Sequence, residues 1–277
     1  MDFKKFNLNN SVAFITGAGG FLGLQHAEAL LKSGATVVLS DISKESLEKS
    51  TNCLKDRYEL GKIYQVYADV TSPNSIKEAK KIVNDKNLFV DILINNAAID
   101  PKVKEDLNLN TSSRLESFDL IDWDKQIAVG LTGALNCIKI FGTDMAQSKK
   151  NCVILNIASD LSVIAPDQRI YKKQGHSEKS QQVKPVTYSV IKSGLVGLTK
   201  YVATYWCNQG VRCNALSPGG IFNKQNKEFV KRINNLIPMD RMANIDEYQG
   251  AVQFLCSEAS SYMTGQNIVI DGGRSIW

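Results

Sequence analysis

The sequence lacks the features of a membrane protein, a disulfide-rich secreted protein or a metalloprotein. No run in its 277 residues approaches the roughly 18 to 20 apolar residues that a membrane span needs. Its six cysteines are scattered without a Cys-x-x-Cys pair, and no Cys, His, Asp and Glu cluster has metal-ligand spacing, so we expect no disulfide framework and no metal. The formal charge of +5 is mild and spread out, which gives little support for a nucleic-acid partner. The amino terminus shows no signal-peptide pattern, so we expect a cytoplasmic protein.

What the sequence does have is a glycine cluster between a predicted strand and a predicted helix. Val12–Thr16 is apolar and rich in β-branched residues, and helical spacing of apolar residues begins at Phe21. In a dinucleotide site, such glycines permit a tight turn, the close approach of a pyrophosphate and close helix–strand packing. The helix start adds free N–H groups for the phosphates. The glycines would also suit an ordinary turn, but their context predicts a cofactor site formed by Gly17, Gly19, Gly20, Phe21, Leu22 and Gly23.

A carboxylate ends the second predicted strand, Thr36–Asp41. Asp41 follows Gly17 at about the distance, roughly 20 residues, at which an acid takes the ribose hydroxyls of a dinucleotide. A carboxylate there would repel a 2′-phosphate, so NAD is expected and NADP is disfavoured. The alternative is that Asp41 caps the helix predicted at Ser43–Leu60.

Strands and helices alternate along the chain without a linker or a repeat. This order predicts an α/β fold, a Rossmann-like, doubly wound parallel sheet of seven strands, in one domain over residues 1–277. The predicted strands are Val12–Thr16, Thr36–Asp41, Ile63–Ala68, Val90–Asn95, Cys152–Ile157, Val211–Leu216 and Asn267–Asp271. The longer predicted helices are Phe21–Lys32, Ser43–Leu60, Pro73–Asn87, Asp119–Ser148 and Tyr188–Asn208.

Several motifs fall in the order of a known family. They are Asp69-Val70, Asn95-Asn-Ala-Ala98, Tyr188-x-x-x-Lys192, Pro218-Gly219 and the tail Met263–Gly273. Over almost its whole length the chain resembles the compact, single-domain branch of the short-chain dehydrogenases/reductases, and its second half is similar to reductases of flagellin-glycan and nonulosonic-acid pathways. The resemblance implies a small-molecule substrate and a homodimer or homotetramer. It also implies cofactor contacts from Asp69, Val70, Asn96, Ala97, Ala98, Tyr188, Lys192, Pro218, Gly219, Ile221 and Asn223.

The candidate catalytic residues are Ser159, Tyr188 and Lys192. Tyrosine and lysine four residues apart at a helix start project from one face. A phenol ordinarily titrates near pH 10, too high for a proton shuttle, and a neighbouring ammonium favours the phenolate. Ser159 follows the fifth strand, at the edge where open parallel sheets bind ligands. The resemblance implies that the serine hydrogen-bonds the reacting oxygen, the tyrosine passes the proton and the lysine also holds the nicotinamide ribose.

Three positions depart from the family pattern. Phe21 stands where a middle glycine is usual, and Gly17-x-x-Gly20-x-x-Gly23 matches the extended branch instead, but the segment after Lys192 is short and fits the compact branch. Gly130 replaces an asparagine that helps to hold a relay water. We expect backbone carbonyls or a neighbouring polar side chain to hold that water, and the glycine to permit a local kink. Asn223 replaces a threonine whose hydrogen bonds an amide can also make.

The stretch between the candidate serine and tyrosine is longer than is usual in the family. This insertion, about residues 165–187, carries Arg169, Lys172, Lys173, His176, Lys179 and Lys184 against Asp167 and Glu178. It is either a solvated surface loop or a lid that selects an anionic substrate, such as a sugar phosphate, a nucleotide sugar or a sugar acid. The candidate substrate residues are Asp160 and Arg169. His26, on the glycine helix, is assigned to packing or to the surface.

Taken together, these features predict an NAD-dependent oxidoreductase that interconverts a secondary alcohol and a ketone on a polar or anionic sugar-like substrate. Two alternatives stay open. One is an epimerase or dehydratase that recycles a tightly held NAD. The other is a catalytically idle nucleotide-binding sensor or scaffold, which the glycine at position 130 favours.

Overall fold

The fold is a seven-stranded parallel sheet, as the sequence predicts. The computed structural model describes residues 4–99, 113–173, 175, 177 and 181–277. The strand order is β3-β2-β1-β4-β5-β6-β7, with every neighbouring pair parallel. The strands are β1 (Val12–Thr16), β2 (Thr36–Asp41), β3 (Ile63–Tyr67), β4 (Ile92–Asn95), β5 (Cys152–Ile157), β6 (Val211–Pro218) and β7 (Asn267–Ile270). Strand β6 runs two residues beyond its predicted end because its pairing with β7 continues to Pro218 and Ile270.

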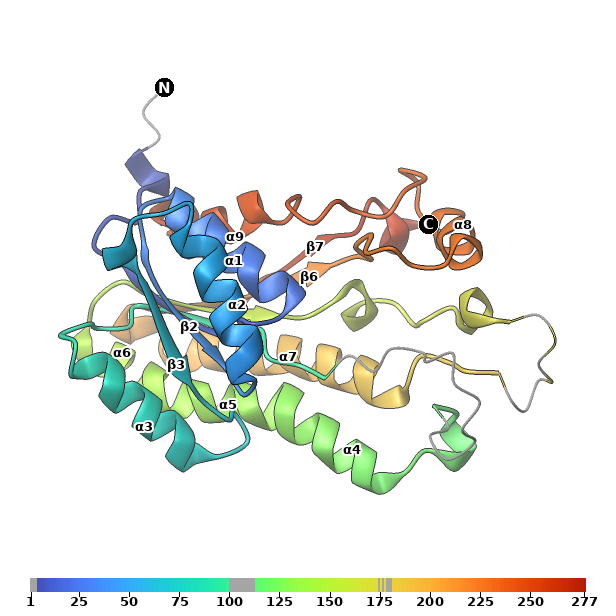
Figure 1. Cartoon of the computed structure of the whole chain (residues 1–277), viewed down its shortest axis with the longest axis horizontal. Helices are drawn as coiled ribbons and strands as arrows, with labels where there is room; N and C mark the ends of the chain where they lie inside the picture. The colour runs from blue at the N-terminus through green and yellow to red at the C-terminus, as the bar shows by residue number, and fades with distance from the viewer. Residues whose placement is uncertain (1–3, 100–112, 174, 176, 178–180) are drawn as a thin grey trace.

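Helices cover both faces of the sheet (Figure 1). One face packs against α1 (Phe21–Lys32), α2 (Lys44–Lys55) and α9 (Gln249–Cys256). The other packs against α3 (Pro73–Asn84), α7 (Val186–Tyr205) and a long helical stretch that contains α4 (Leu120–Ile127), α5 (Gly133–Cys137) and α6 (Thr143–Ser148). Successive strand side chains face opposite sides, so Ile15 enters the first core and Phe14 the second, where its ring lies 4.4 Å from that of Phe141.

Four of the five longer predicted helices differ in extent from the structure. Helix α3 ends at Asn84 and not at Asn87, and α7 covers Val186–Tyr205 and not Tyr188–Asn208. Helix α2 ends at Lys55 and not at Leu60, because Arg57 and Tyr58 turn back to the carboxylate of Glu28, at 2.7 and 3.1 Å. The helix predicted at Asp119–Ser148 contains two π-helical stretches, Ala128–Thr132 and Ile138–Gly142.

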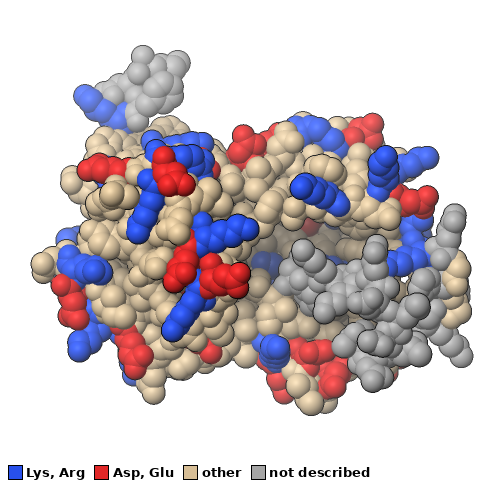
Figure 2. Space-filling model, viewed as in Figure 1, with Lys and Arg blue, Asp and Glu red and all other residues tan. Residues whose placement is uncertain are grey.

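The carboxyl ends of the strands meet at one edge, where the sequence motifs converge. Helix α8 (Lys227–Asn234), the carboxyl terminus and the described part of the insertion lie on this side of the molecule (Figure 1). In the same view, Figure 2 shows the surface hollowed between the α1 and α2 side and the segments around α8. Within the described part of the chain, no helix combines the length and apolar character that a membrane span requires.

Candidate active site

The glycine loop after β1 is packed so tightly that side chains would not fit. Gly17 has a left-handed backbone, with φ of +62°, and a Cβ there would lie 2.8 Å from the Cα of Ala97. A Cβ on Gly23 would lie 2.3 Å from the carbonyl oxygen of Gly17, so α1 could not pack this closely on the loop. Helix α1 begins after Gly20 without a side-chain cap, which leaves its first N–H groups for a ligand. The loop therefore fits the pyrophosphate of a dinucleotide.

Asp41 braces this loop from the end of β2. Its Oδ2 accepts a hydrogen bond from the Gly19 N–H at 2.9 Å, and its Oδ1 accepts one from the Ser43 N–H at 2.9 Å. The side-chain cap of α2 is Ser43, whose hydroxyl accepts from the Ser46 N–H, so Asp41 is not the cap. A carboxylate is thereby fixed beside the glycine loop, with lone pairs left for ribose hydroxyls.

Asn96 and Thr16 connect the ends of β4 and β1. The Asn96 amide donates to the carbonyl oxygens of Thr16 and Gly17, both at 3.1 Å, and the Thr16 hydroxyl accepts from the N–H groups of Asn96 and Ala97. His26 is buried on α1 next to Asn96. Burial holds the pKa of His26 down at about 4, the hydrogen bond with Asn96 opposes this shift, and the charge of Lys192 adds to it. His26 thus packs as an uncharged residue on α1, near enough to the candidate catalytic Lys192 to feel its charge.

The three candidate catalytic residues come from β5 and α7. The Lys192 Nζ is buried and donates to the carbonyl oxygen of Ile157 at 2.8 Å, two residues before Ser159. It also lies 5.7 Å from the centre of the Tyr188 ring, one helical turn away. In the turn before the tyrosine, the Thr187 hydroxyl donates to the buried side chain of Gln126. The lysine is therefore fixed between the tyrosine and the serine strand.

Asp160, a candidate substrate residue, is buried in an ion pair. Its Oδ2 lies 2.7 Å from Nη1 of Arg274, and both side chains are almost fully buried. Its Oδ1 accepts from the Ser159 hydroxyl at 2.8 Å. An ionised carboxylate can only accept, so the serine proton points to Asp160 in this state. Arg274, from the carboxyl-terminal turn, was missed in the sequence because it stands 114 residues away.

Gly130, at the position of the family asparagine, lies in the first π-helical stretch. A Cβ there would lie 2.8 Å from Cγ2 of Ile191, on the helix that carries the tyrosine and the lysine. The glycine therefore lets the two helices approach closely. Gln126, one turn earlier, is the buried polar side chain nearest to it along the helix.

The insertion is partly described. His176, Glu178 and Lys179 lie outside the described residues. Arg169 is exposed, and its guanidinium pairs with the carboxylate of Asp167, with Nη2 2.6 Å from Oδ2. The base of the insertion is held by glutamine side chains that bond the backbone across it, with Gln168 on Lys184 and Gln181 on Lys173.

Two further groups of predicted cofactor residues lie at the same edge of the sheet. After β3, the Asp69 carboxylate accepts from the N–H and hydroxyl of Thr71, and the Val70 carbonyl accepts from Asn136. After β6, the Gly219 N–H donates to Ile270, and the exposed Asn223 begins a turn held by Gln225. Pro218 and Ile221 lie beside Gly219 in the chain, and Ala98 follows Asn96 and Ala97 after β4.

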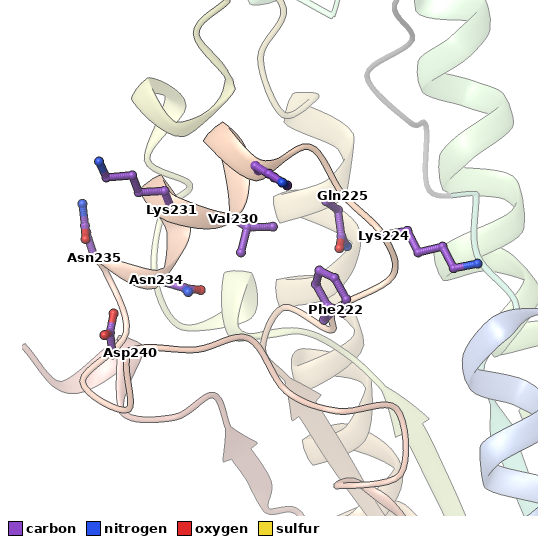
Figure 3. A pocket seen from close by; sticks show the side chains of 9 residues that line it. Phe222, Lys224, Gln225, Val230, Lys231, Asn234, Asn235 and Asp240 are labelled. Carbon is purple, nitrogen blue, oxygen red and sulfur yellow. The ribbon is translucent and has the colours of Figure 1, made fainter.

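A groove of about 650 Å³ opens between α8 and the loop that follows Ile221 (Figure 3). Its lining carries three lysines and none of the three candidate catalytic residues. The lining residues are Phe222, Lys224, Gln225, Lys227, Val230, Lys231, Asn234, Asn235 and Asp240. The groove places positive charge beside the loop that bears Asn223.

A glycine-loop dinucleotide cradle and a Tyr-x-x-x-Lys helix on one parallel sheet define a class of nicotinamide-dependent oxidoreductases. Residues 17–275 match the family described as enoyl-(acyl carrier protein) reductase. The chain is 30% identical to the 3-oxoacyl-[acyl-carrier-protein] reductase of Thermotoga maritima, over 97% of this chain and 99% of that one. The chain belongs to the short-chain dehydrogenase/reductase family, whose members use NAD or NADP, and it is an oxidoreductase.

Two solved structures show the same fold. A gluconate 5-dehydrogenase from Burkholderia cenocepacia, in complex with NADP and tartrate, has a TM-score of 0.82 and 25% identity and covers 98% of this chain and 97% of its own. A short-chain dehydrogenase from Leptospira borgpetersenii with bound NAD+ has a TM-score of 0.83 and 29% identity. The match covers 100% of this chain and 97% of the Leptospira chain. One of these relatives binds NADP and the other binds NAD+. The similarity to flagellin-glycan and nonulosonic-acid reductases stays a prediction.

Proposed function

We propose that the protein is an NAD-dependent oxidoreductase that interconverts a secondary alcohol and a ketone on a polar or anionic sugar-like substrate. The observation that carries the proposal is the Tyr188 and Lys192 pair, with the lysine Nζ held 2.8 Å from the Ile157 carbonyl oxygen below Ser159. The bound cofactor supplies the hydride acceptor for oxidation and the hydride donor for reduction.

The chain's own residues move the proton. In the oxidation direction, Tyr188 takes the proton of the substrate hydroxyl, and in reduction it returns a proton to the carbonyl oxygen. The Lys192 ammonium stabilises the deprotonated tyrosine. Ser159 holds the reacting oxygen in place, and its hydroxyl must then exchange its bond with Asp160 for one with the substrate. Gly17–Gly23 would hold the pyrophosphate of the cofactor, and Asp41 would accept hydrogen bonds from its adenosine ribose hydroxyls.

Asp41 and its surroundings support the preference for NAD. Its carboxylate is fixed between the glycine loop and the start of α2. The next residue is Ile42, which is exposed and offers no charge to a 2′-phosphate. Lys44 lies over the ring of Tyr67, with its Nζ 5.5 Å from the ring centre.

Positive charge around the substrate end supports an anionic substrate. Lys224, Lys227 and Lys231 line the groove beside α8 together with one acid, Asp240. The described part of the insertion adds Arg169, Lys172, Lys173 and Lys184. Gluconate, which the Burkholderia relative is named for, is a sugar acid of this class. Sugar phosphates and nucleotide sugars carry the same sign of charge.

The test is a turnover screen with D-gluconate, sugar phosphates and nucleotide sugars, each with NAD and NADP. We expect a net change in nicotinamide absorbance that Tyr188→Phe lowers by about 10² to 10⁴-fold while NAD binding stays nearly intact. Lys192→Met should lose both rate and affinity for NAD. Tyr262→Phe is the control, because Tyr262 is a fully exposed tyrosine outside helix α7.

The alternatives predict other outcomes. An epimerase or dehydratase would purify with NAD and convert substrate without a net absorbance change. An idle sensor would bind NAD and turn over nothing, and Tyr188→Phe would then change no rate.

The assembly and location belong to the same proposal. Exposed Tyr201 and Tyr205 stack on the outer face of α7, with ring centres 5.6 Å apart, which supports a homodimer or homotetramer that pairs through this helix. All six cysteines are free thiols, which supports a cytoplasmic location.

A further inference from the structure

A second lysine lies against the ring of Tyr188. The Lys184 Nζ lies 3.7 Å from the centre of that ring, closer than the 5.7 Å of Lys192. Lys184 comes from the end of the insertion, four residues before the tyrosine, and Lys192 follows the tyrosine by four. The tyrosine therefore has two ammonium groups at its ring, and the pattern of the family accounts for only one of them.

The backbone of Lys184 is held by specific contacts. Its N–H donates to Oε1 of Gln168 at 2.8 Å, and its carbonyl oxygen accepts from Nε2 of the same side chain at 3.3 Å. The next residue, Pro185, precedes the first turn of α7, and its carbonyl oxygen accepts from the Tyr188 N–H at 3.1 Å. The lysine thus reaches the ring from a backbone that is bonded on both sides.

Among the described residues, the titratable groups near the serine and Lys192 add no net charge to that of the two lysines at neutral pH. Asp160 and Arg274, behind the serine, form a pair 2.7 Å apart whose charges offset each other. His26, below Lys192, is uncharged at neutral pH because burial keeps its pKa at about 4. The side chains of Gln126 and Thr187 in the adjoining turn are neutral.

We propose that Lys184 is a positioning residue that acts through Tyr188, stabilising its phenolate and holding its ring. The inference rests on the proposed function, because it takes Tyr188 as the group that moves the proton. A cation over an aromatic face is attracted to the ring, and an ammonium close to an acid lowers its pKa. The insertion would then take part in the chemistry and not only in substrate selection.

The test measures the titration of Tyr188 directly and needs no substrate. The protein is labelled with ¹³Cζ-tyrosine, and Tyr188→Phe identifies one signal among the nine tyrosines. We expect Lys184→Met to raise the titration midpoint of that signal by about one pH unit. Lys184→Arg should restore most of the effect, because it keeps the cation. Lys172→Met is the control, since Lys172 is an exposed lysine of the same insertion.

The two proposals fail in different ways. An unchanged midpoint in Lys184→Met, or an equal shift in Lys172→Met, would overturn the role of Lys184 and leave the proposed function standing. Near-normal turnover in Tyr188→Phe would overturn the proposed function and this inference with it. The expected titration shift, joined by a matching shift in the pH profile of kcat, would support both.

Discussion

At the end of β1, a Cβ added to Gly17, Gly19 or Gly23 would lie within 2.8 Å of a neighbouring atom. At the end of β5, by contrast, the side chains of Ser159, Asp160 and Arg274 hold one another through a hydrogen bond and an ion pair. The nucleotide end of the candidate site is shaped by backbone segments that lie too close together to admit side chains. The substrate end is shaped by charged side chains, some of them from segments far apart in the chain.

This difference determines how each end should respond to substitution. At the nucleotide end, an added methyl group acts by steric overlap and its effect stays local. At the substrate end, the loss of one charge leaves a partner buried without compensation. The carboxyl-terminal turn is therefore connected to Ser159, the candidate catalytic serine, through Asp160 and Arg274.

The largest effect is expected from Arg274→Met. It would leave the Asp160 carboxylate buried and unpaired, and breaking a buried pair in this way typically lowers the free energy of unfolding by about 3 to 5 kcal/mol. Urea unfolding measures the loss. The double variant Asp160→Asn with Arg274→Met removes both charges and should regain much of it. A loss below about 1 kcal/mol in the single variant would show that the pair is not what holds this end.

A smaller effect is expected from Gly23→Ala at the nucleotide end. The added Cβ would meet the Gly17 carbonyl oxygen at 2.3 Å and the Ala18 Cα at 2.6 Å. Overpacking of this kind costs about 1 to 3 kcal/mol, and displacement of the loop should also weaken NADH binding. The control is Gly250→Ala on α9, where a Cβ meets nothing within 4 Å. It should stabilise the helix by roughly 0.5 to 1 kcal/mol. Equal behaviour of the two variants would refute the steric account.

The same contrast explains what could be predicted from the sequence. Tight turns and close backbone contacts require glycine, and buried strands require apolar residues, so both can be recognised in the sequence. Accordingly β1, β2, β5 and α1 begin and end where the sequence predicts. A partner 114 residues away leaves no local pattern, and so the pairing of Asp160 with Arg274 was not foreseen. Lys184 was counted only as loop charge, although Lys-x-x-x-Tyr-x-x-x-Lys is visible in the sequence.

Asp41→Asn tests how much the charge of Asp41 contributes to the choice between NADH and NADPH. An amide keeps one acceptor oxygen for the Gly19 N–H but removes the charge that would repel a 2′-phosphate. We expect the preference for NADH over NADPH to narrow about tenfold, which corresponds to about 1.4 kcal/mol. Fluorescence titration with both cofactors measures it, and Asp56→Asn at the end of α2 is the charge-matched control. Equal or tighter binding of NADPH by the unchanged protein would contradict the preference for NAD.

The smallest effect on stability is expected from Arg169→Ala, because Arg169 is an exposed residue of the insertion. Its side chain is 80% exposed and pairs with Asp167, and an exposed pair contributes little to the free energy of unfolding because solvent screens it. Recognition is a separate matter, because the carboxylate of Asp167 competes for the guanidinium that an anionic substrate would use. If Arg169 binds substrate, Arg169→Ala should raise the KM of the anionic substrate and Asp167→Ala should lower it. Neither should change the KM of an uncharged analogue, and added salt should shrink both effects because the site is open to solvent. Equal changes for the charged and uncharged compounds would mean that Arg169 only pairs with its neighbour, and selection of the anion would then fall to the lysines beside α8.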